Sequence, residues 1–245
     1  DGRVLHAGTP SGAEARVVQF GPALISPGFV DLDALSDLDT TILGVDHNPG
    51  WAKGRVWPRD YAERAREMYS PDDLAFQKRF AFGQLLMSGI TSAAPIASLF
   101  YREWGETVAE FDAAAEAAGE MGLRVFLTPA YRAGGLVLDE PGMPVPYFDE
   151  ERGFAGLDAA IAFIKHQHGR HGGLINGMLA PDRVETCTAE LLRRTDAAAK
   201  DLDCKIRLHM AQGVLERQTV EALHGMAGPA WLESLGLLSD RLSCP

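Results

Sequence analysis

The feature that most constrains the fold of this chain is an alternation of short apolar runs with helical patterns, which begins near residue 23. Such an alternation is typical of a parallel sheet wrapped by helices. The predicted strands are 23–31, 89–96, 123–129, 174–179, 205–210 and 241–244. A closed (β/α)8 barrel needs eight strand–helix units. We therefore predict an α/β chain of TIM-barrel type with about six βα units present.

The first 22 residues have a different pattern from the rest of the chain. Glycines and prolines surround a short alternation at 16–20, which predicts a hairpin left from a small β-sandwich domain. The expected domains are thus 1–22, the remnant, and 23–245, an incomplete barrel that looks cut at both ends. An open barrel leaves two unpaired edge strands, so a homo-oligomer or aggregation is expected. A Gly- and Pro-rich segment at 133–153 predicts a long binding loop.

Composition excludes several classes of function. Lys and Arg number 23 against 34 Asp and Glu, a net charge of −11 that repels phosphate backbones and argues against a nucleic-acid partner. No apolar run approaches the roughly 20 residues of a membrane span. The three cysteines are far apart and form no CxxC pair, which argues against a disulfide framework and a thiolate zinc site. The expected location is the cytoplasm.

In a strand–helix barrel the chemistry lies at the carboxyl ends of the strands. Asp31 and Asp33 follow the first predicted strand, with Asp37 and Asp39 close behind. Two carboxylates on one strand face repel each other unless a cation, an arginine or a proton balances them. Caps and solvated loop aspartates are an equally good interpretation of this cluster. His209 ends an apolar strand, and is either a metal or substrate ligand or a core histidine.

Other histidines give a misleading signal. His166 and His168 have the His-x-His spacing that metals favour, with His171 nearby. These residues end a predicted helix that leads into the strand at 174–179, so they belong to the amino-terminal face of the barrel. Favourable interaction with the helix carboxyl terminus explains them. The sequence has no nucleophile elbow and no phosphate-binding glycine loop.

Several segments, in order, resemble the amidohydrolase superfamily, in the branch that holds cytosine deaminases and chlorohydrolases. The run from Pro27 to Leu35 resembles that family's first strand, Pro-Gly-Phe-x-Asp-x-His-x-His, and Gly89-Ile90-Thr91 resembles its Gly-Ile-Thr-Thr. Further matches are Gly122-Leu123-Arg124, Ala180-Pro181-Asp182 for Ala-Pro-His, His209 to Gln212 for His-x-x-Glu, and Gly236-Leu237-Leu238. The resemblance covers essentially the whole chain.

The resemblance implies a hydrolase in which a divalent metal, zinc or iron, lowers the pKa of a bound water. Three positions depart from the family pattern. The His-x-His is Asp33-Ala34-Leu35, the acid/base glutamate is Gln212, and the histidine of Ala-Pro-His is Asp182. Gln212 cannot exchange a proton near neutral pH, and Leu35 cannot bind a metal.

Two hypotheses follow for the function. The first is a hydrolase of carbon–nitrogen, non-peptide bonds in a small molecule, by deamination or by amide or ring hydrolysis. In this hypothesis His209 and Asp33 hold the metal. The residues Gln212, Asp182 and Asp31 act on the substrate. If no metal is bound, Asp31 or Asp33 is the general base. Tyr131, Arg132 and Asn176 would line the pocket, and Arg132 or Arg207 would hold an anionic group. The alternative is a metal-free relative that binds a small ligand or a partner without hydrolysis.

Overall fold

A computed structural model of the chain describes residues 7–8, 16–36, 56–57, 60, 69–97, 106–139 and 143–245. Its centre is a curled sheet of six parallel strands in the order β1-β3-β4-β7-β8-β9. The strands are β1 (Phe29–Leu35), β3 (Ile90–Ile96), β4 (Arg124–Leu127), β7 (Ile175–Leu179), β8 (Lys205–Arg207) and β9 (Leu242–Ser243). The predicted partial barrel of TIM-barrel type is confirmed. β1 begins later than expected, at Phe29.

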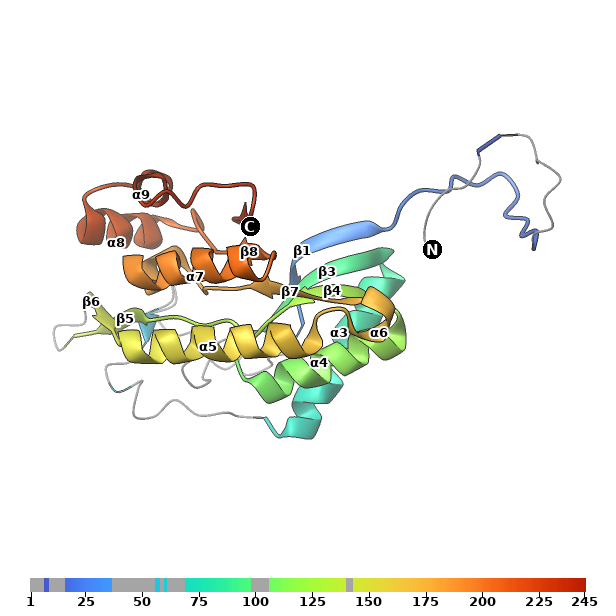
Figure 1. Ribbon diagram of the computed structural model, residues 1–245, viewed down its shortest axis with the longest axis horizontal. Coiled ribbons are helices and arrows are strands. Elements are labelled where there is room, and N and C mark those ends of the chain that lie inside the picture. The colour runs from blue at the N-terminus through green and yellow to red at the C-terminus, as the bar shows by residue number, and fades with distance from the viewer. Residues whose placement is uncertain are drawn as a thin grey trace.

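Helices alternate with these strands and lie side by side along the sheet (Figure 1). They are α3 (Pro71–Met87), α4 (Val108–Met121), α5 (Glu150–Gln167), α6 (Arg170–Gly173), the 3-10 turn η2 (Val184–Thr186), α7 (Ala189–Asp201), α8 (Val214–His224) and α9 (Gly228–Ser234). Apolar side chains between sheet and helices are fully buried, including Phe111, Val125, Leu127, Ile175 and Leu191. The helices therefore cover the outer face of the sheet and leave the strand ends to form the rim.

Local sequence signals set where the helices begin. Ser70 and Asp73 form a capping box at the start of α3, with Pro71 at the first helical position, and the Ser70 contacts lower the pKa of Asp73. Thr188 accepts a hydrogen bond from the Leu191 N–H, as its predicted capping role requires.

A buried ion pair joins two of the covering helices. Lys78 on α3 has no exposed side-chain surface, and its ammonium lies 2.6 Å from the Glu110 carboxylate on α4. The same ammonium donates to the Ser36 hydroxyl, 3.0 Å away, and Ser36 donates to the Ile96 carbonyl. Every group in this set has a partner, so the pair ties α3 and α4 to the ends of β1 and β3.

The segment expected to be a long loop is in large part a second, small sheet. Residues 134–138 form β5 (Gly134–Leu138), which pairs antiparallel with β6 (Pro144–Phe148) and parallel with β2 (Val56–Trp57). The prediction of an irregular loop was wrong because prolines at the first and third positions of β6 hide its strand pattern. This hairpin projects at one end of the main sheet (Figure 1).

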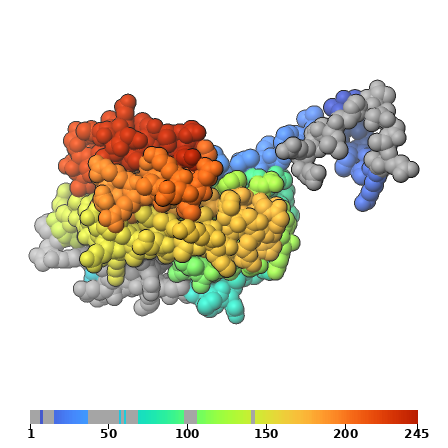
Figure 2. All heavy atoms as spheres, viewed as in Figure 1, coloured from blue at the N-terminus to red at the C-terminus, as the bar shows by residue number. Residues whose placement is uncertain are grey.

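Residues 16–28 have no regular secondary structure and lead away from the compact body (Figure 2). Residues 16–20 form no strand with the described residues, and nearly all of the preceding residues lie outside the described part, so the hairpin stays a prediction. The domain boundary at residue 22 stays a prediction. All three cysteines are free, with Cys187 and Cys204 buried. Among the described residues, no helix is long and apolar enough to cross a membrane.

Candidate active site

Three of the predicted site residues meet at the carboxyl ends of the strands. The Asp33 Oδ1 atom on β1 lies 2.9 Å from His209 Nε2, beyond β8. The other ring nitrogen, Nδ1, lies 3.0 Å from the carbonyl oxygen of Asp182, which follows β7. A carbonyl can only accept, so Nδ1 carries a proton and donates it. His209 is thereby held with Nε2 facing the carboxylate, and it joins three strands of the curled sheet.

Asp182 is the most unusual carboxylate of this group. It is 7% exposed, and its Oδ2 atom has no hydrogen-bond partner among the described residues. It borders a closed cavity of about 10 Å³, room for about one water molecule. The cavity is also lined by Trp57, Arg132, Gly135, Leu136, Arg183, Glu185 and Thr186. A buried carboxylate oxygen without a partner costs free energy, so this atom is free for a ligand or a water.

Two arginines surround this cavity. The Arg132 guanidinium, at the predicted substrate position, is buried and lies 6.0 Å from the centre of the Trp57 ring. Arg183 pairs with Glu185 at 2.6 Å. Burial raises the pKa of Glu185, although the Arg183 charge opposes that shift. The cavity is thus polar and charged, and Arg132 and Asp182 both line it.

Three other predicted site residues make different contacts. The Tyr131 hydroxyl lies 2.9 Å from Thr195 Oγ1 on α7, so its ring is buried toward the helix layer, and burial raises its pKa. Asn176 sits at the amino end of β7, where its amide donates to the carbonyls of Val125, Gly173 and Leu174. The structure therefore does not bring the Tyr131 or Asn176 side chain to the strand-end group, although the Tyr131 carbonyl accepts from the Asp182 N–H at 2.8 Å. Asp31 accepts from the Asp33 N–H at 3.0 Å and so shapes β1 itself.

The turn after His209 is held by a residue that the sequence did not single out. Both carboxylate oxygens of Glu216 accept backbone hydrogen bonds, from Ala211 at 2.7 Å and from Gln212 at 2.9 Å. Ala211 has φ of 63°, a left-handed conformation that is unfavourable for a residue with a side chain. The two hydrogen bonds to Glu216 fix the backbone of this turn and leave the Gln212 side chain exposed at the rim of the sheet, where it can position a ligand.

Glu106 is a second residue that sequence analysis missed. Its carboxylate accepts from the Ala97 N–H just beyond β3 and from the Ala130 N–H beyond β4, each at 2.6 Å. Burial raises the pKa of Glu106 to about 7, and the nearby Glu110 charge adds to this shift, against the opposing effect of Arg207. An acidic residue shortly before a helix resembles an ordinary cap in sequence, so no signal marked this role.

The histidines assigned to the amino-terminal face do lie there, in structural contacts. His168 Nδ1 accepts from the Gly177 N–H at 3.2 Å, and His171 Nε2 lies 3.2 Å from Glu116 Oε2. Gln167, between the predicted pair, donates to Asp112. The residues of the His-x-His spacing thus serve the packing of α5 on α4 and β7.

The donor set at the strand ends does not fit a resident divalent metal. Catalytic zinc takes three protein ligands and a water, and here Asp33 and His209 supply two. Among the described residues, no three His, Cys, Asp or Glu side chains group as metal ligands. Leu35, at the position of the family's second histidine, is 64% exposed and has no donor atom. The Nδ1–H bond to a carbonyl is an arrangement also common in metal-bound histidines, but it does not replace the missing ligands.

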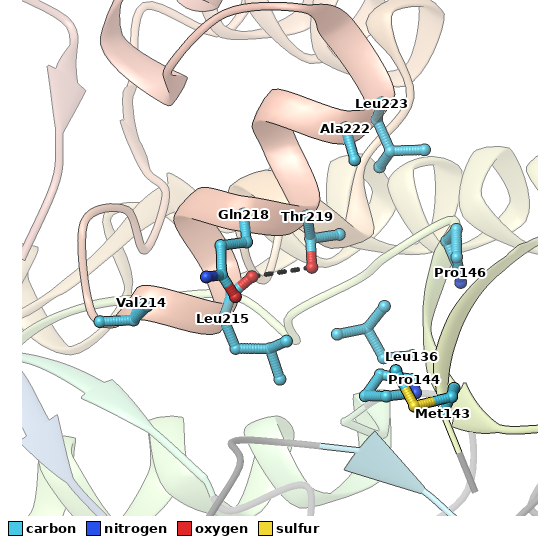
Figure 3. A pocket seen from close by; sticks show the side chains of 10 residues that line it. All are labelled: Leu136, Met143, Pro144, Pro146, Val214, Leu215, Gln218, Thr219, Ala222 and Leu223. Atoms are coloured by element: carbon cyan, nitrogen blue, oxygen red, sulfur yellow. Dashed lines mark hydrogen bonds between the residues drawn. The ribbon is translucent and has the colours of Figure 1, made fainter. Parts of the chain in front are cut away.

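A large apolar cavity lies beside this group, between the β5–β6 hairpin and α8 (Figure 3). Its volume is about 730 Å³, within the range of small-molecule pockets. Its lining residues are Leu136, Met143, Pro144, Pro146, Val214, Leu215, Gln218, Thr219, Ala222 and Leu223. Leu136 also lines the small cavity of Asp182, and Val214 begins α8 directly after the turn that Glu216 holds. The large cavity therefore shares one lining residue, Leu136, with the small cavity of Asp182.

Comparison with known proteins shows what the chain is similar to in sequence and in fold. No family model matches the chain. It is 28% identical over 235 residues to the 5-methylthioadenosine/S-adenosylhomocysteine deaminase of Moorella thermoacetica, covering 94% of this chain and 47% of the relative. The corresponding deaminase of Desulforudis audaxviator is 25% identical, over 97% of this chain and 49% of its own length. The chain spans about half the length of the curated relatives it matches.

Solved structures show the same fold. Atrazine chlorohydrolase of Arthrobacter aurescens, complexed with zinc, superposes with a TM-score of 0.63 at 22% identity, over 88% of this chain and 47% of that one. Adenosine deaminase of Xanthomonas campestris, with bound zinc, gives 0.58 at 20% identity, over 88% and 43%. The chain is thus similar in sequence to deaminases and has the fold of a chlorohydrolase and an adenosine deaminase, in agreement with the resemblance drawn from its motifs.

Proposed function

We propose that this chain forms part of a hydrolase that cleaves a carbon–nitrogen, non-peptide bond of a small molecule. The observation that carries the proposal is the contact of His209 Nε2 with Asp33 Oδ1 at 2.9 Å, at the carboxyl ends of the strands. The relatedness to deaminases supports it. A cytoplasmic location and a nitrogen-rich ring as substrate belong to the same proposal.

The chain's own groups suggest how the reaction proceeds. The Asp33–His209 pair can take a proton from a water while the water oxygen bonds to the electrophilic carbon. The same pair can then deliver this proton to the departing nitrogen as the carbon–nitrogen bond breaks, and ammonia or an amine leaves. The free Asp182 Oδ2 would accept a hydrogen bond from a ring N–H, and the Gln212 amide would orient the ring.

A zinc or iron ion is the cofactor that the family resemblance suggests, and when bound it would lower the pKa of the attacking water. The described residues offer such an ion two ligands, Asp33 and His209, so no step of the reaction is assigned to a metal. The apolar cavity would take an apolar substituent of the substrate, because it opens beside the strand-end group. Such a substituent gains free energy roughly in proportion to the apolar area that it buries.

Release of ammonia or an amine from a panel of small molecules tests the proposal. The purified protein would be incubated with 5′-methylthioadenosine, S-adenosylhomocysteine, 5′-deoxyadenosine, guanine and atrazine, each with and without added zinc. We expect turnover of at least one compound, and a fall of at least tenfold in kcat/KM for Asp182→Asn. No release from any compound by a folded protein would contradict the proposal.

The apolar cavity has a test of its own on α8. Ala222→Trp fills the cavity, whereas Glu221→Trp adds the same ring at the neighbouring exposed position, outside the cavity lining. For a substrate with an apolar substituent we expect Ala222→Trp to raise KM several-fold and Glu221→Trp to leave it unchanged. Equal effects of the two variants would exclude the cavity from substrate binding.

A second candidate function is favoured by Leu35 and Gln212. These residues stand where the family pattern has a metal ligand and an acid/base, so the site could bind a small ligand without hydrolysing it. Calorimetric binding of a panel compound at one per chain, with no product after long incubation with zinc, would establish this alternative. Turnover that His209→Ala abolishes in a folded protein would rule it out.

A further inference from the structure

Arg207 extends across the inside of the curled sheet. It belongs to β8, yet its Nη1 atom donates to the carbonyl oxygens of Ala94 and Pro95 on β3, each 3.1 Å away. β4 and β7 separate β3 from β8 in the sheet, so a side chain can join these strands only across the concave face. Arg207 is 4% exposed. Its guanidinium therefore fills the interior beneath the strand-end group.

Three carboxylates act on this guanidinium through space, although none of them lies within 4 Å of it. Arg207 interacts electrostatically with Glu106 beyond β3, with Asp33 on β1 and with Asp182 beyond β7. Burial lowers the pKa of Arg207 and these three charges raise it, and a guanidinium in a protein stays protonated. Since residues two apart on a strand share a face, Arg207 and His209 both point into the interior. A fixed positive charge is thus part of the site.

The charge of Arg207 explains why the side chains at the strand ends do not form a complete binding site for a divalent metal ion. Two carboxylates and a histidine that approach one another need a balancing cation, and Arg207 is already there. A divalent ion at Asp33 and His209 would have two donors and a buried guanidinium of the same sign nearby. We infer that Arg207 supplies the positive charge of this site in place of a divalent metal ion. The inference concerns charge balance, and it holds whether the protein hydrolyses its ligand or only binds it.

Zinc binding, measured apart from activity, tests the inference. Purified protein would be dialysed against zinc and then against buffer, and its metal content determined, with affinities from competition with a chromogenic chelator. We expect the wild type to retain less than 0.1 zinc per chain. Arg207→Met should bind zinc at least tenfold more tightly than the wild type, because Asp33 and Asp182 then lack their cation. Arg207→Lys, which keeps the charge, should remain as zinc-poor as the wild type.

A matched control is available at the other end of the sheet. Arg241 pairs with Asp203 at 3.0 Å, so Arg241→Met removes the same charge there and should leave zinc affinity unchanged. One zinc per wild-type chain that survives dialysis would overturn the inference, even if Arg207→Met does not fold. An affinity that Arg207→Met leaves unchanged, or that Arg241→Met raises equally, would also overturn it.

Discussion

Histidines and carboxylates occur at both ends of the central sheet, in different hydrogen-bonding states. At the amino ends of β4 and β7, His168 and Asn176 are bound to backbone groups, and His171 contacts Glu116. At the carboxyl ends, the Asp33 side chain is 44% exposed and Asp182 Oδ2 has no partner among the described residues. Saturated polar groups at one end support packing, whereas groups with unused bonding capacity at the other can bind a ligand. Residue type alone does not separate the two ends.

The largest effect on stability is expected at the buried Lys78–Glu110 ion pair, which ties helices α3 and α4 to the carboxyl ends of β1 and β3. Lys78→Met leaves the buried Glu110 without its cation, which should lower the free energy of unfolding by roughly 3–5 kcal/mol. Chemical denaturation would measure it. The double variant Lys78→Met/Glu110→Leu should recover most of the loss, because no buried charge is then unpaired. A loss under 1 kcal/mol in the single variant would show that this pair does not hold α3 to α4.

Glu106 should make stability depend on pH. Its pKa is raised to about 7 in the folded protein from 4.5, so between these values the folded state holds the proton that the unfolded state has released. The stability that this group contributes is full below pH 4.5 and is lost as pH rises to about 7. The loss should be on the order of 2 kcal/mol. Comparison of Tm at pH 5 and pH 8 should show a smaller difference in Glu106→Gln than in the wild type.

At the amino end, Asn176→Ala should affect stability alone. Removing its amide leaves the Val125, Gly173 and Leu174 carbonyls with one donor fewer, at a cost of about 1–2 kcal/mol. Ligand affinity and turnover per folded molecule should stay as in the wild type. If Asn176→Ala instead weakened ligand binding tenfold in a stable protein, the distinction between the two ends would fail.

The smallest effect concerns the turn that follows His209. Ala211→Gly should raise the free energy of unfolding by about 0.5 kcal/mol, because glycine adopts a positive φ without strain but costs entropy on folding. Ala198→Gly, inside α7, is the control and should lower it by about 1 kcal/mol. Thermal unfolding of both variants would show opposite shifts in Tm. Shifts of the same sign would contradict the strained turn.

The sequence predicted the sheet well because strand and helix periods differ: five strands lie within the expected segments, and β1 is shifted toward Leu35. It did not predict β5 and β6, whose prolines mask the strand pattern. The rule that sites lie at carboxyl ends of strands found Asp33, Asp182 and His209, which the structure brings together. Of the residues expected to line the pocket, Asn176 is at the other end of its strand, and the Tyr131 side chain turns toward α7.

Contacts between residues that are far apart in the sequence could not be predicted from the sequence. Arg207 had been considered only as a cation for an anionic substrate, and its contacts with Ala94 and Pro95 lie more than a hundred residues away. Glu106 and Glu216 act on backbone N–H groups, which every residue but proline carries, so no pattern marks them. Such roles depend on distances that the fold alone creates.

The central claim is that the carboxyl end of the sheet carries the function and the amino end does not. The most direct test compares His209→Ala with His168→Ala, both checked for a cooperative unfolding transition, in the hydrolysis or binding of a panel compound. We predict that His209→Ala loses at least a hundredfold in kcat/KM or ligand affinity, while His168→Ala keeps both within twofold. Equal losses in the two variants, or a larger loss in His168→Ala, would contradict the claim.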